Sequence, residues 1–363
     1  MKYEKEDLSL ENGLKKEWII TNGIGGYSSS TIIGANTRKY HGLLVAPLLP
    51  PGNRQLILSK LDESIEIGEK KYNLYTNVCE NYISDGYKQL ISFEKEYIPI
   101  FTYQVENVII KKFICLEYGK NLVSIYYYVK NMGDEAILNI APIINFRDFH
   151  SVNENDNIKF IQYIDKNKVK LIMNDNFQNP IYFYSSDGEY IKHEYDIFKN
   201  MYYIEEEKRG QKAKENHVVP GVYKIKIGAQ EEKSFTFVCS LEQNIEEVDA
   251  KELINKEIIR LSTLIYNTDL LDDKKKESKD TNYINLVKNF VIATDNFVVY
   301  RPSFALYTLI AGYPWFLDWG RDTLIAFEGI LLKTRRFKKA KEVLLTCIRD
   351  MKYGLVPNRI FWL

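Results

Sequence analysis

The sequence predicts an antiparallel β domain followed by the beginning of an α-helical domain. Apolar segments alternate with turn residues from Gln55 to Leu241, and beyond that point the apolar spacing becomes helical. The chain of 363 residues is about twice as long as a typical domain, so two hydrophobic cores are expected. We therefore assign a β domain to residues 1–245, a connecting helix and charged linker to 246–282, and helical sequence to 283–363.

The β domain is predicted from segments rich in β-branched and aromatic residues. A strand recurs about every 10 to 15 residues, and Gly, Asn or Asp stands at the breaks. The predicted strands are 55–67, 71–80, 97–118, 121–131, 136–146, 168–174, 180–186, 221–229 and 234–241. This pattern is typical of an antiparallel β-sandwich.

The helical pattern begins at residues 244–267, where Glu252 and Lys256 are spaced for an i, i+4 ion pair. The charged segment Leu271–Asp280 follows as the predicted linker. Three further helices are predicted at 283–300, 323–334 and 337–354. One of these three is nearly apolar all round, so we expect it to be buried.

The charge balance argues against two classes of partner. The 49 Lys and Arg residues equal the 49 Asp and Glu residues, which leaves no bulk field to attract nucleic acid or a membrane surface. A neutral or small substrate fits better. No stretch reaches the roughly 18 apolar residues of a membrane span, and the charged N-terminus is unlike a secretory signal. These features predict a cytoplasmic protein.

The sequence offers no pattern for a metal or a nucleotide cofactor. The four cysteines have no C-x-x-C spacing and the four histidines form no H-x-x-x-H pair. The glycines of Gly23–Gly26 lack the third glycine of a dinucleotide-binding loop. Reduced, buried thiols and tight turns are the expected roles of these residues, and no cofactor is predicted.

Two acids, Asp318 and Asp322, lie within the aromatic stretch Gly312–Ile330, GYPWFLDWGRDTLIAFEGI. If Asp322 begins the helix that follows, the helix terminus lowers its pKa, whereas burial against the aromatic rings raises it. The two acids are four residues apart. They therefore face each other if both are on a helix, but one helical and one loop position is equally consistent.

The residue types of this stretch also fit a sugar-binding pocket. The rings of Tyr313, Trp315 and Trp319 can pack on the apolar face of a pyranose, and carboxylates and Arg321 can bind its hydroxyl groups. Glycoside cleavage generally needs two carboxyl groups, one of which donates a proton to the leaving oxygen. The alternative is an ordinary aromatic core with helix-capping acids.

Two further segments carry polar residues next to predicted strands. Arg38 and His41 lie in the glycine-rich segment Glu17–Leu48, on a turn that can either reach a ligand or bond only to the backbone. The segment Asn145–His150 ends an apolar strand with Arg147, Asp148 and His150, and it reads as a loop that faces a neighbouring domain. A buried salt bridge is the alternative for that segment.

These motifs together resemble a known family. The segment from Glu17 to Glu63, EWIITNGIGGYSSSTIIGANTRKYHGLLVAPLLPPGNRQLILSKLDE, is similar to the N-terminal domain of prokaryotic glycogen debranching enzymes. The stretch GYPWFLDWGRDTLIAFEGILL resembles the start of their amylo-α-1,6-glucosidase domain, and NFRDFH fits between the two. The resemblance covers the whole chain in order.

The resemblance implies a β-sandwich beside an (α/α)6 toroid that hydrolyses α-1,6-linked glucose of glycogen or limit dextrin, with inversion and without a cofactor. It implies that Asp322 is the general acid, that Arg321 and Trp319 shape the glucose subsite, and that Asp318 is the second candidate for the acid or holds a glucose hydroxyl. It also implies that the residues Arg38, His41, Arg147, Asp148 and His150 lie near the mouth of the site.

The sequence also departs from the family. A toroid needs about twelve helices and roughly three are predicted after the linker, so we expect an incomplete toroid with exposed apolar faces and a catalytic base beyond residue 363. The alternatives to a debranching glucosidase are a non-catalytic fragment that at most binds glucan, and a related disaccharide phosphorylase or hydrolase of the toroid class.

Overall fold

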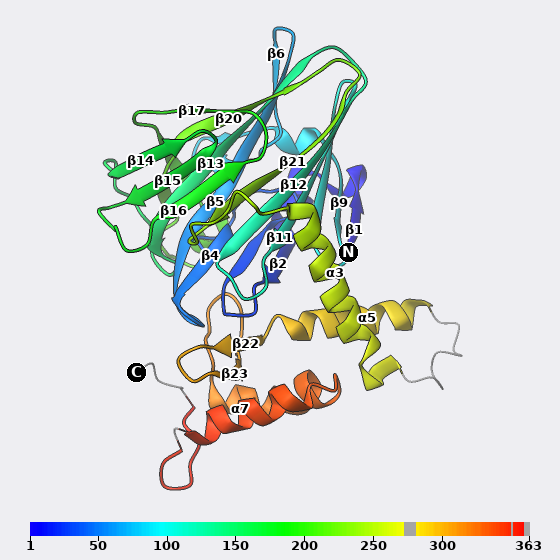
Figure 1. The fold of residues 1–363 in the computed structure, drawn as a ribbon, viewed down its shortest axis with the longest axis vertical. Helices are drawn as coiled ribbons and strands as arrows, with labels where there is room; N and C mark the ends of the chain where they lie inside the picture. Colours follow the sequence, from blue (N-terminus) through cyan, green and yellow to red (C-terminus); the bar gives the residue numbers. More distant parts are fainter. Residues whose placement is uncertain (272–280, 350, 359–363) are drawn as a thin grey trace.

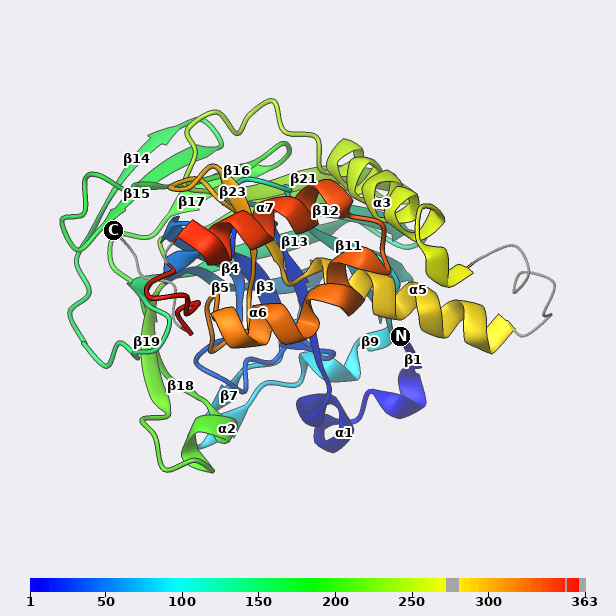
Figure 2. The same cartoon turned by 90° about the horizontal axis from the view of Figure 1, so that it is seen from below.

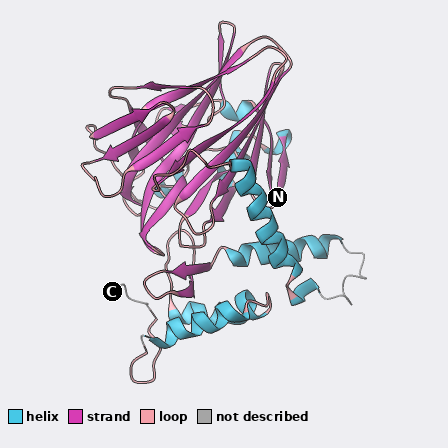
Figure 3. Cartoon of the chain, in the orientation of Figure 1, coloured by secondary structure: helices cyan, strands magenta, loops and turns pink. Residues whose placement is uncertain are grey.

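The computed structural model describes residues 1–271, 281–349 and 351–358. Two large antiparallel sheets pack face to face, and the longer helices gather at one end of them (Figures 1 and 3). The prediction of antiparallel β structure followed by helices is therefore confirmed. Of the predicted linker Leu271–Asp280, only Leu271 belongs to the described residues.

The first sheet contains nine strands, which pair in the order β1-β9-β10-β11-β12-β21-β16-β15-β14. Their bounds are β1 Lys2–Glu4, β9 Leu90–Lys95, β10 Pro99–Val105, β11 Val108–Leu116, β12 Leu122–Asn131, β14 Phe160–Asp165, β15 Lys168–Met173, β16 Ile181–Ser185 and β21 Glu232–Ser240. The predicted strand 97–118 is thus two strands, because a turn with a positive φ of 48° at Glu106 divides it.

The second sheet contains twelve strands, with β2-β3-β4-β5-β13-β19-β18-β7-β8 as its main order. Their bounds are β2 Glu17–Thr21, β3 Tyr27–Thr31, β4 Gly42–Leu49, β5 Gly52–Ile67, β6 Lys70–Asn73, β7 Val78–Cys79, β8 Tyr82–Ile83, β13 Ala136–Asp148, β17 Glu189–Lys192, β18 Ile197–Tyr202, β19 Lys214–Val218 and β20 Gly221–Ile227. The long strands β5 and β13 pair along most of their length and form the centre of this sheet.

One hydrophobic core lies between the two sheets. It includes Val123 and Phe237 from the first sheet and Leu58 and Ile140 from the second, all of them fully buried. Alternate residues of a strand point to opposite faces, so the inward residues of both sheets can meet in this way. The β region is therefore a sandwich with a hydrophobic core of its own.

The connecting helix α3, Ala250–Tyr266, forms as the sequence predicts. The side chain of Asp249 accepts hydrogen bonds from the backbone N–H groups of Lys251 and Glu252 at 2.8 and 3.3 Å, which caps the helix start. Glu252 and Lys256 form the expected i, i+4 ion pair at 2.7 Å. The helix packs on the outer face of the first sheet, over β11, β12 and β21, and runs to the remaining helices (Figure 1).

The other helices are α5 Thr281–Asp295, α6 Gly320–Phe327 and α7 Phe337–Arg349, with a π-helical turn η4 Glu328–Leu332 after α6. Shorter helical turns are η1 Lys5–Asp7, α1 Leu10–Lys15, η2 Gly86–Lys88, α2 Ile204–Glu207 and η3 Asp269–Leu271. Only the beginning of a helical domain is therefore seen in the described residues, and a closed toroid is not.

Two helical predictions need correction. The predicted helix 283–300 ends at Asp295, and Val298–Arg301 is instead the strand β22, which pairs with β23, Leu306–Leu309. The expectation of a wholly buried helix is also wrong, because each of α5, α6 and α7 exposes large apolar side chains. Ile325 of α6, for example, is 78 % exposed.

Candidate active site

A closed loop carries the aromatic residues from β23 to the start of α6. Ile310 and Asp318 form a β-bridge at its base, the Ala311 N–H donates to the Leu317 carbonyl at 2.8 Å, and the Phe316 N–H donates to the Gly312 carbonyl at 2.8 Å. These bonds fix the path of the loop, so its aromatic side chains have defined directions.

The β-sandwich holds this loop through Arg54 of β5. Its side chain is fully buried, and its Nη1 donates to the carbonyls of Pro314 at 2.9 Å and Phe316 at 3.4 Å. The guanidinium carbon lies 4.7 Å from the centre of the Tyr313 ring and 5.5 Å from that of Phe149. Its Nε and Nη2 groups have no hydrogen-bond partner. Arg54 therefore joins the sandwich to the loop, and two of its N–H groups remain without a hydrogen-bond acceptor.

Trp315 is the main aromatic contact between the loop and the sandwich. Its ring meets the Tyr40 ring edge to face at 5.9 Å, and Tyr40 in turn contacts the ring of His150 at 5.6 Å. The hydroxyl of Tyr40 lies 3.2 Å from Nδ1 of His150. Arg38 and Arg209 lie over the Trp315 ring at 5.8 and 5.5 Å. The ring therefore has little freedom to move.

A cavity of about 400 Å³ opens between the loop and the end of β13. This volume lies within the range of small-molecule sites. Its walls combine carboxylates, aromatic rings and amide or imidazole groups, contributed by Asn53, Arg54, Asp148, Phe149, His150, Trp315, Phe316, Leu317, Asp318 and Trp319. We call it the seam cavity, because both the sandwich and the α6 region contribute to it.

A slightly larger cavity of about 450 Å³ lies between β2 and α5. Its walls are mainly apolar, with Trp18, Ile19, Leu286 and Phe290 among them. Binding sites for polar ligands need convergent polar groups as well as space. The seam cavity has such groups at its centre, so we assign the candidate site to it.

Asp318 is the most buried acid of the seam cavity. It is 1 % exposed, its Oδ2 accepts a hydrogen bond from Arg301 Nη1 at 2.5 Å, and its Oδ1 has no hydrogen-bond partner. Burial raises the pKa of Asp318, and the positive charge of Arg301 opposes this shift. Asp318 is therefore a wall residue of the cavity, and one of its carboxyl oxygens has no hydrogen-bond partner among the described residues.

Asp322 lies one turn further on, in the first turn of α6. It is half-buried, and its buried Oδ2 has no hydrogen-bond partner. It does not line the seam cavity. Of the two acids, therefore, only Asp322 is on the helix, and Asp318 is in the loop before it. This is one of the two arrangements that their spacing allowed.

The start of α6 is held by the chain segment Pro357–Asn358. The Gly320 N–H donates to the Asn358 carbonyl at 2.8 Å, and the Arg321 N–H donates to the Asn358 side chain at 3.2 Å. A Cβ atom at position 320 would lie 2.3 Å from the Pro357 carbonyl oxygen, so glycine is needed there. The Arg321 side chain is exposed and does not line the cavity.

Five sandwich residues were predicted to lie near the mouth of the site, and the structure places only two of them at the seam cavity. Asp148 and His150 line the seam cavity, and burial lowers the pKa of His150 while Asp148 opposes this shift. Arg38 does not line it but pairs with Glu17 at 2.8 Å. His41 is 2 % exposed and accepts a hydrogen bond from the Thr37 N–H at 3.1 Å.

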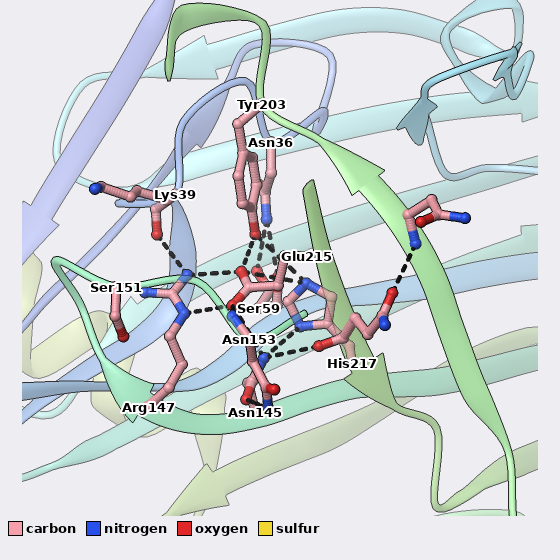
Figure 4. A network of polar contacts seen from close by, with 12 residues as sticks. Asn36, Lys39, Ser59, Asn145, Arg147, Ser151, Asn153, Tyr203, Glu215 and His217 are labelled. Carbon is pink, nitrogen blue, oxygen red and sulfur yellow. Dashed lines mark hydrogen bonds and ion pairs between the residues drawn. The ribbon is translucent and has the colours of Figure 1, made fainter. Parts of the chain in front are cut away.

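Arg147 forms a buried salt bridge, which is the alternative to the predicted ligand contact. Its Nε and Nη2 donate to the two oxygens of Glu215 at 2.5 and 2.7 Å, and Nη2 also donates to the Lys39 carbonyl (Figure 4). Tyr203 donates a hydrogen bond to the same carboxylate, and His217 lies beside it. Arg147 therefore bonds the end of β13 to Glu215 of β19 and to the Lys39 carbonyl, and it does not line the cavity.

Several residues of the site were absent from the predicted set. Arg54, Asn53 and Phe149 line the cavity, and Arg301 pairs with Asp318. Arg54 lies inside a segment used for the family resemblance, but a single arginine before an apolar strand carries no sign of its partners 260 residues away. Only the fold brings it to the loop.

The described residues include no group of three or more His, Cys, Asp or Glu side chains placed to hold a metal ion. Within the same ranges, no helix has both the length and the apolar character to cross a membrane.

Comparison with known proteins gives matches to two family models. The model "Glycogen debranching enzyme N terminal" matches residues 16–234, and the model "Amylo-alpha-1,6-glucosidase" matches residues 292–361. The glycogen debranching enzyme of Saccharomyces cerevisiae is 48 % identical over 40 residues, which are 11 % of this chain and 3 % of the yeast protein.

Solved structures give looser similarities. A bacterial glucoamylase complexed with acarbose superposes with a TM-score of 0.45 at 12 % identity, over 94 % of this chain and 49 % of the glucoamylase. A polysaccharide lyase superposes with a TM-score of 0.29 at 12 % identity, over 60 % of this chain and 28 % of the lyase. The chain thus spans less than half of each of these relatives. Because the first family model covers more than half of its residues, the chain belongs to the glycogen debranching enzyme family.

Proposed function

We propose that the seam cavity binds a terminal glucose unit of a branched α-glucan and that the chain acts in hydrolysis of α-1,6 branch points, with inversion. The observation that carries this proposal is the buried Asp318, which lines a cavity together with two tryptophans, a histidine and a second carboxylate. The match of residues 292–361 to the amylo-α-1,6-glucosidase model supports the choice of reaction.

Recognition of the sugar is assigned to both sides of the cavity. The rings of Trp315 and Trp319 offer apolar faces to a pyranose, and Asp148, Asp318 and His150 offer polar atoms to its hydroxyl groups. The unused N–H groups of Arg54 suit a hydroxyl oxygen or developing negative charge. A glucose unit therefore meets the mixture of apolar and polar surface that it needs.

We assign the proton donor to Asp322, as the family resemblance implies, and the hydroxyl-binding role to Asp318. The ion pair of Asp318 with Arg301 favours a charged carboxylate that accepts a hydrogen bond. Asp322 has no ion pair to a described residue and its buried Oδ2 has no hydrogen-bond partner, so this side chain must turn toward the seam cavity when glucan binds in order to donate a proton. The raised pKa of Asp318 is the observation that favours the opposite assignment.

The two assignments are separated by glucose release from phosphorylase limit dextrin, measured for the 363-residue chain and for the product of any in-frame extension of its gene. In a form that releases glucose, Asp322→Asn should lower kcat by about 10²- to 10⁴-fold, which is the usual contribution of general acid catalysis. Binding of the dextrin should change little. Loss of turnover in Asp318→Asn with normal turnover in Asp322→Asn would reverse the two roles.

Glucan binding without hydrolysis is the second candidate function. It is favoured by the position of Asp322 outside the seam cavity. A form of the protein that binds limit dextrin and releases no glucose in prolonged assays would support it. Release of glucose 1-phosphate from a disaccharide in phosphate buffer would instead indicate a phosphorylase and exclude both candidates.

A further inference from the structure

A second polar cavity lies among the helices, apart from the seam cavity. Its volume is about 400 Å³, and its charged walls are Arg260 of α3, Asp295 at the end of α5, Arg335 and Arg336 just before α7, and Lys338 and Lys339 in the first turn of α7. It shares no lining residue with the seam cavity. We call it the basic cavity. Figures 1 and 2 show the three helices that surround it.

Two carboxylates near the basic cavity are already paired. Asp295 bonds to Arg260 Nη2 through Oδ2 at 2.6 Å and to Arg336 Nη1 through Oδ1 at 2.9 Å. Glu257 bonds to Arg260 at 2.7 Å. Asp295 is the acid of the lining, with Glu257 and Glu342 beside it, whereas Arg260, Arg335, Arg336, Lys338 and Lys339 all line the cavity, so cations outnumber acids there.

Lys338 and Lys339, in the first turn of α7, contribute two of the positive charges that line the cavity. Neither forms an ion pair with a described residue, and Lys339 lies over the Tyr307 and Tyr118 rings at 4.5 and 5.9 Å. Burial lowers the pKa of Lys339, and the neighbouring Arg336 and Arg260 charges lower it further, while Asp295 opposes them. The local potential is therefore positive, as an anion site requires.

Arg336 gives an independent sign of a missing partner. The residue is 8 % exposed, and its Nη1 and Nη2 groups donate to Asp295 and to the Thr294 hydroxyl, at 2.9 and 3.0 Å. Its Nε has no hydrogen-bond partner. A buried donor without a partner costs about 1 to 3 kcal/mol, so native structures rarely keep one without a reason.

The start of α7 adds backbone donors on the same side. The helix begins at Phe337 and has 13 residues, and the free N–H groups at a helix start carry partial positive charge. Anions bind preferentially at such positions. Phe337 and Leu264 also line the cavity and offer apolar surface to the body of a ligand.

We propose that the basic cavity binds a phosphomonoester dianion carried by a sugar-sized molecule. A doubly charged anion suits a cavity in which cations outnumber acids, and a volume of about 400 Å³ suits a small ligand better than a polymer. The phosphate lies against Arg336, Lys338, Lys339 and the start of α7, and the carbon skeleton lies against Phe337. Bound ligand links α3 to α7 and so stabilises the helical region.

Isothermal titration calorimetry of the 363-residue chain with glucose 6-phosphate, inorganic phosphate and glucose tests this proposal. We expect saturable binding of the ester, weaker binding of phosphate, and no binding of glucose at this site. Lys338→Gln should weaken ester binding roughly tenfold, since it removes one charged contact. Lys338 is exposed, so its replacement should not disturb folding.

Lys341→Gln is the matched control, because Lys341 is an exposed lysine of the same helix that does not line the cavity. Its affinity should equal that of the unchanged chain. Asp318→Asn should also bind the ester normally, which separates this site from the proposed glucan site. Absence of saturable ester binding, equal affinities for ester and phosphate, or equal loss in the Lys338 and Lys341 variants would overturn the proposal.

Discussion

The β-sandwich and the helical region bury their apolar residues to very different extents. In the sandwich, the inward residues of both sheets form one continuous core, and residues as large as Tyr127 and Phe237 are fully buried. In the helical region, α5 exposes Phe290 at 60 %, α6 exposes Ile325 at 78 %, and α7 exposes Ile348 at 52 %. Figure 2 shows these helices lying across one end of the sandwich.

This difference in burial indicates that stability depends mainly on the sandwich and ligand binding mainly on the seam cavity. The sandwich has a fully buried hydrophobic core and buried ion pairs, so substitutions there should act mainly on folding. The seam cavity combines residues of both regions, so substitutions there should act mainly on ligand binding.

Glu215→Gln should give the largest loss of stability. It removes the charge that pairs with the buried Arg147 and leaves that guanidinium without a counterion. Loss of one partner of a buried pair generally costs about 3 to 5 kcal/mol. Urea unfolding should show this loss, whereas Glu80→Gln, which breaks the exposed pair with Lys214, should cost less than about 1 kcal/mol. Similar losses in the two variants would contradict the account.

The same network should make the sandwich sensitive to acid. Burial lowers the pKa of His217 to about 4 from an ordinary value of 6.5, although Glu215 opposes the shift. Between these values the unfolded chain binds a proton that the folded chain does not, so stability falls as the pH falls. Between pH 7 and pH 5 the loss should be about 2 kcal/mol.

His217→Gln removes this titration and should flatten that part of the stability curve. Urea midpoints at pH 7, 6 and 5 measure the change for both proteins. His193→Gln, at a part-exposed histidine outside this buried network, is the matched control substitution. An unchanged slope in His217→Gln would show that the histidine is not kept neutral by burial.

Arg54→Met should act on ligand binding more than on the fold of the sandwich. Methionine fills part of the space among the Tyr313, Phe149 and Tyr27 rings but cannot donate to the loop carbonyls. The loop then loses its attachment to β5, and we expect roughly tenfold weaker glucan binding by calorimetry. Arg54→Lys keeps the charge but lacks the planar group, so it should give an intermediate loss.

Ile325→Gln should have the smallest effect on stability. The side chain is 78 % exposed, so the free energy of unfolding should change by no more than about 0.5 kcal/mol. Binding of a hydrophobic dye and self-association should decrease, because an exposed apolar patch is reduced. Leu331→Gln, at a fully buried position nearby, should instead destabilise the helical region clearly.

Local sequence patterns predicted the long strands of the sandwich and the helices α3, α6 and α7, because strand and helix periodicities are local. They failed where a distant partner decides the structure. Val298–Arg301 continues a helical pattern but forms a strand, since β23 offers it a hydrogen-bonding partner. The short strands β14, β17 and β18 are half-exposed and carry a weaker apolar signal, so they were not predicted.

The candidate site was predicted only in part, because local residue types indicate a pocket but do not indicate the distant residues that complete it. Residue types marked Trp315, Trp319 and Asp318 as a pocket, and the structure places all three in the seam cavity. The partners Arg54 and Arg301 depend on chain crossings that no local pattern reveals. Arg147 matched the motif but pairs with Glu215, which lies 68 residues away in the chain.

Tryptophan fluorescence during titration with limit dextrin tests most directly whether the seam cavity is a glucan site. Trp315 and Trp319 line the cavity, so bound sugar should change their emission in a saturable manner. We predict that Asp148→Asn, at an exposed carboxylate of the same cavity, reduces this change while circular dichroism stays the same. No saturable change in the unchanged chain, or an equal change in Asp148→Asn, would contradict the assignment.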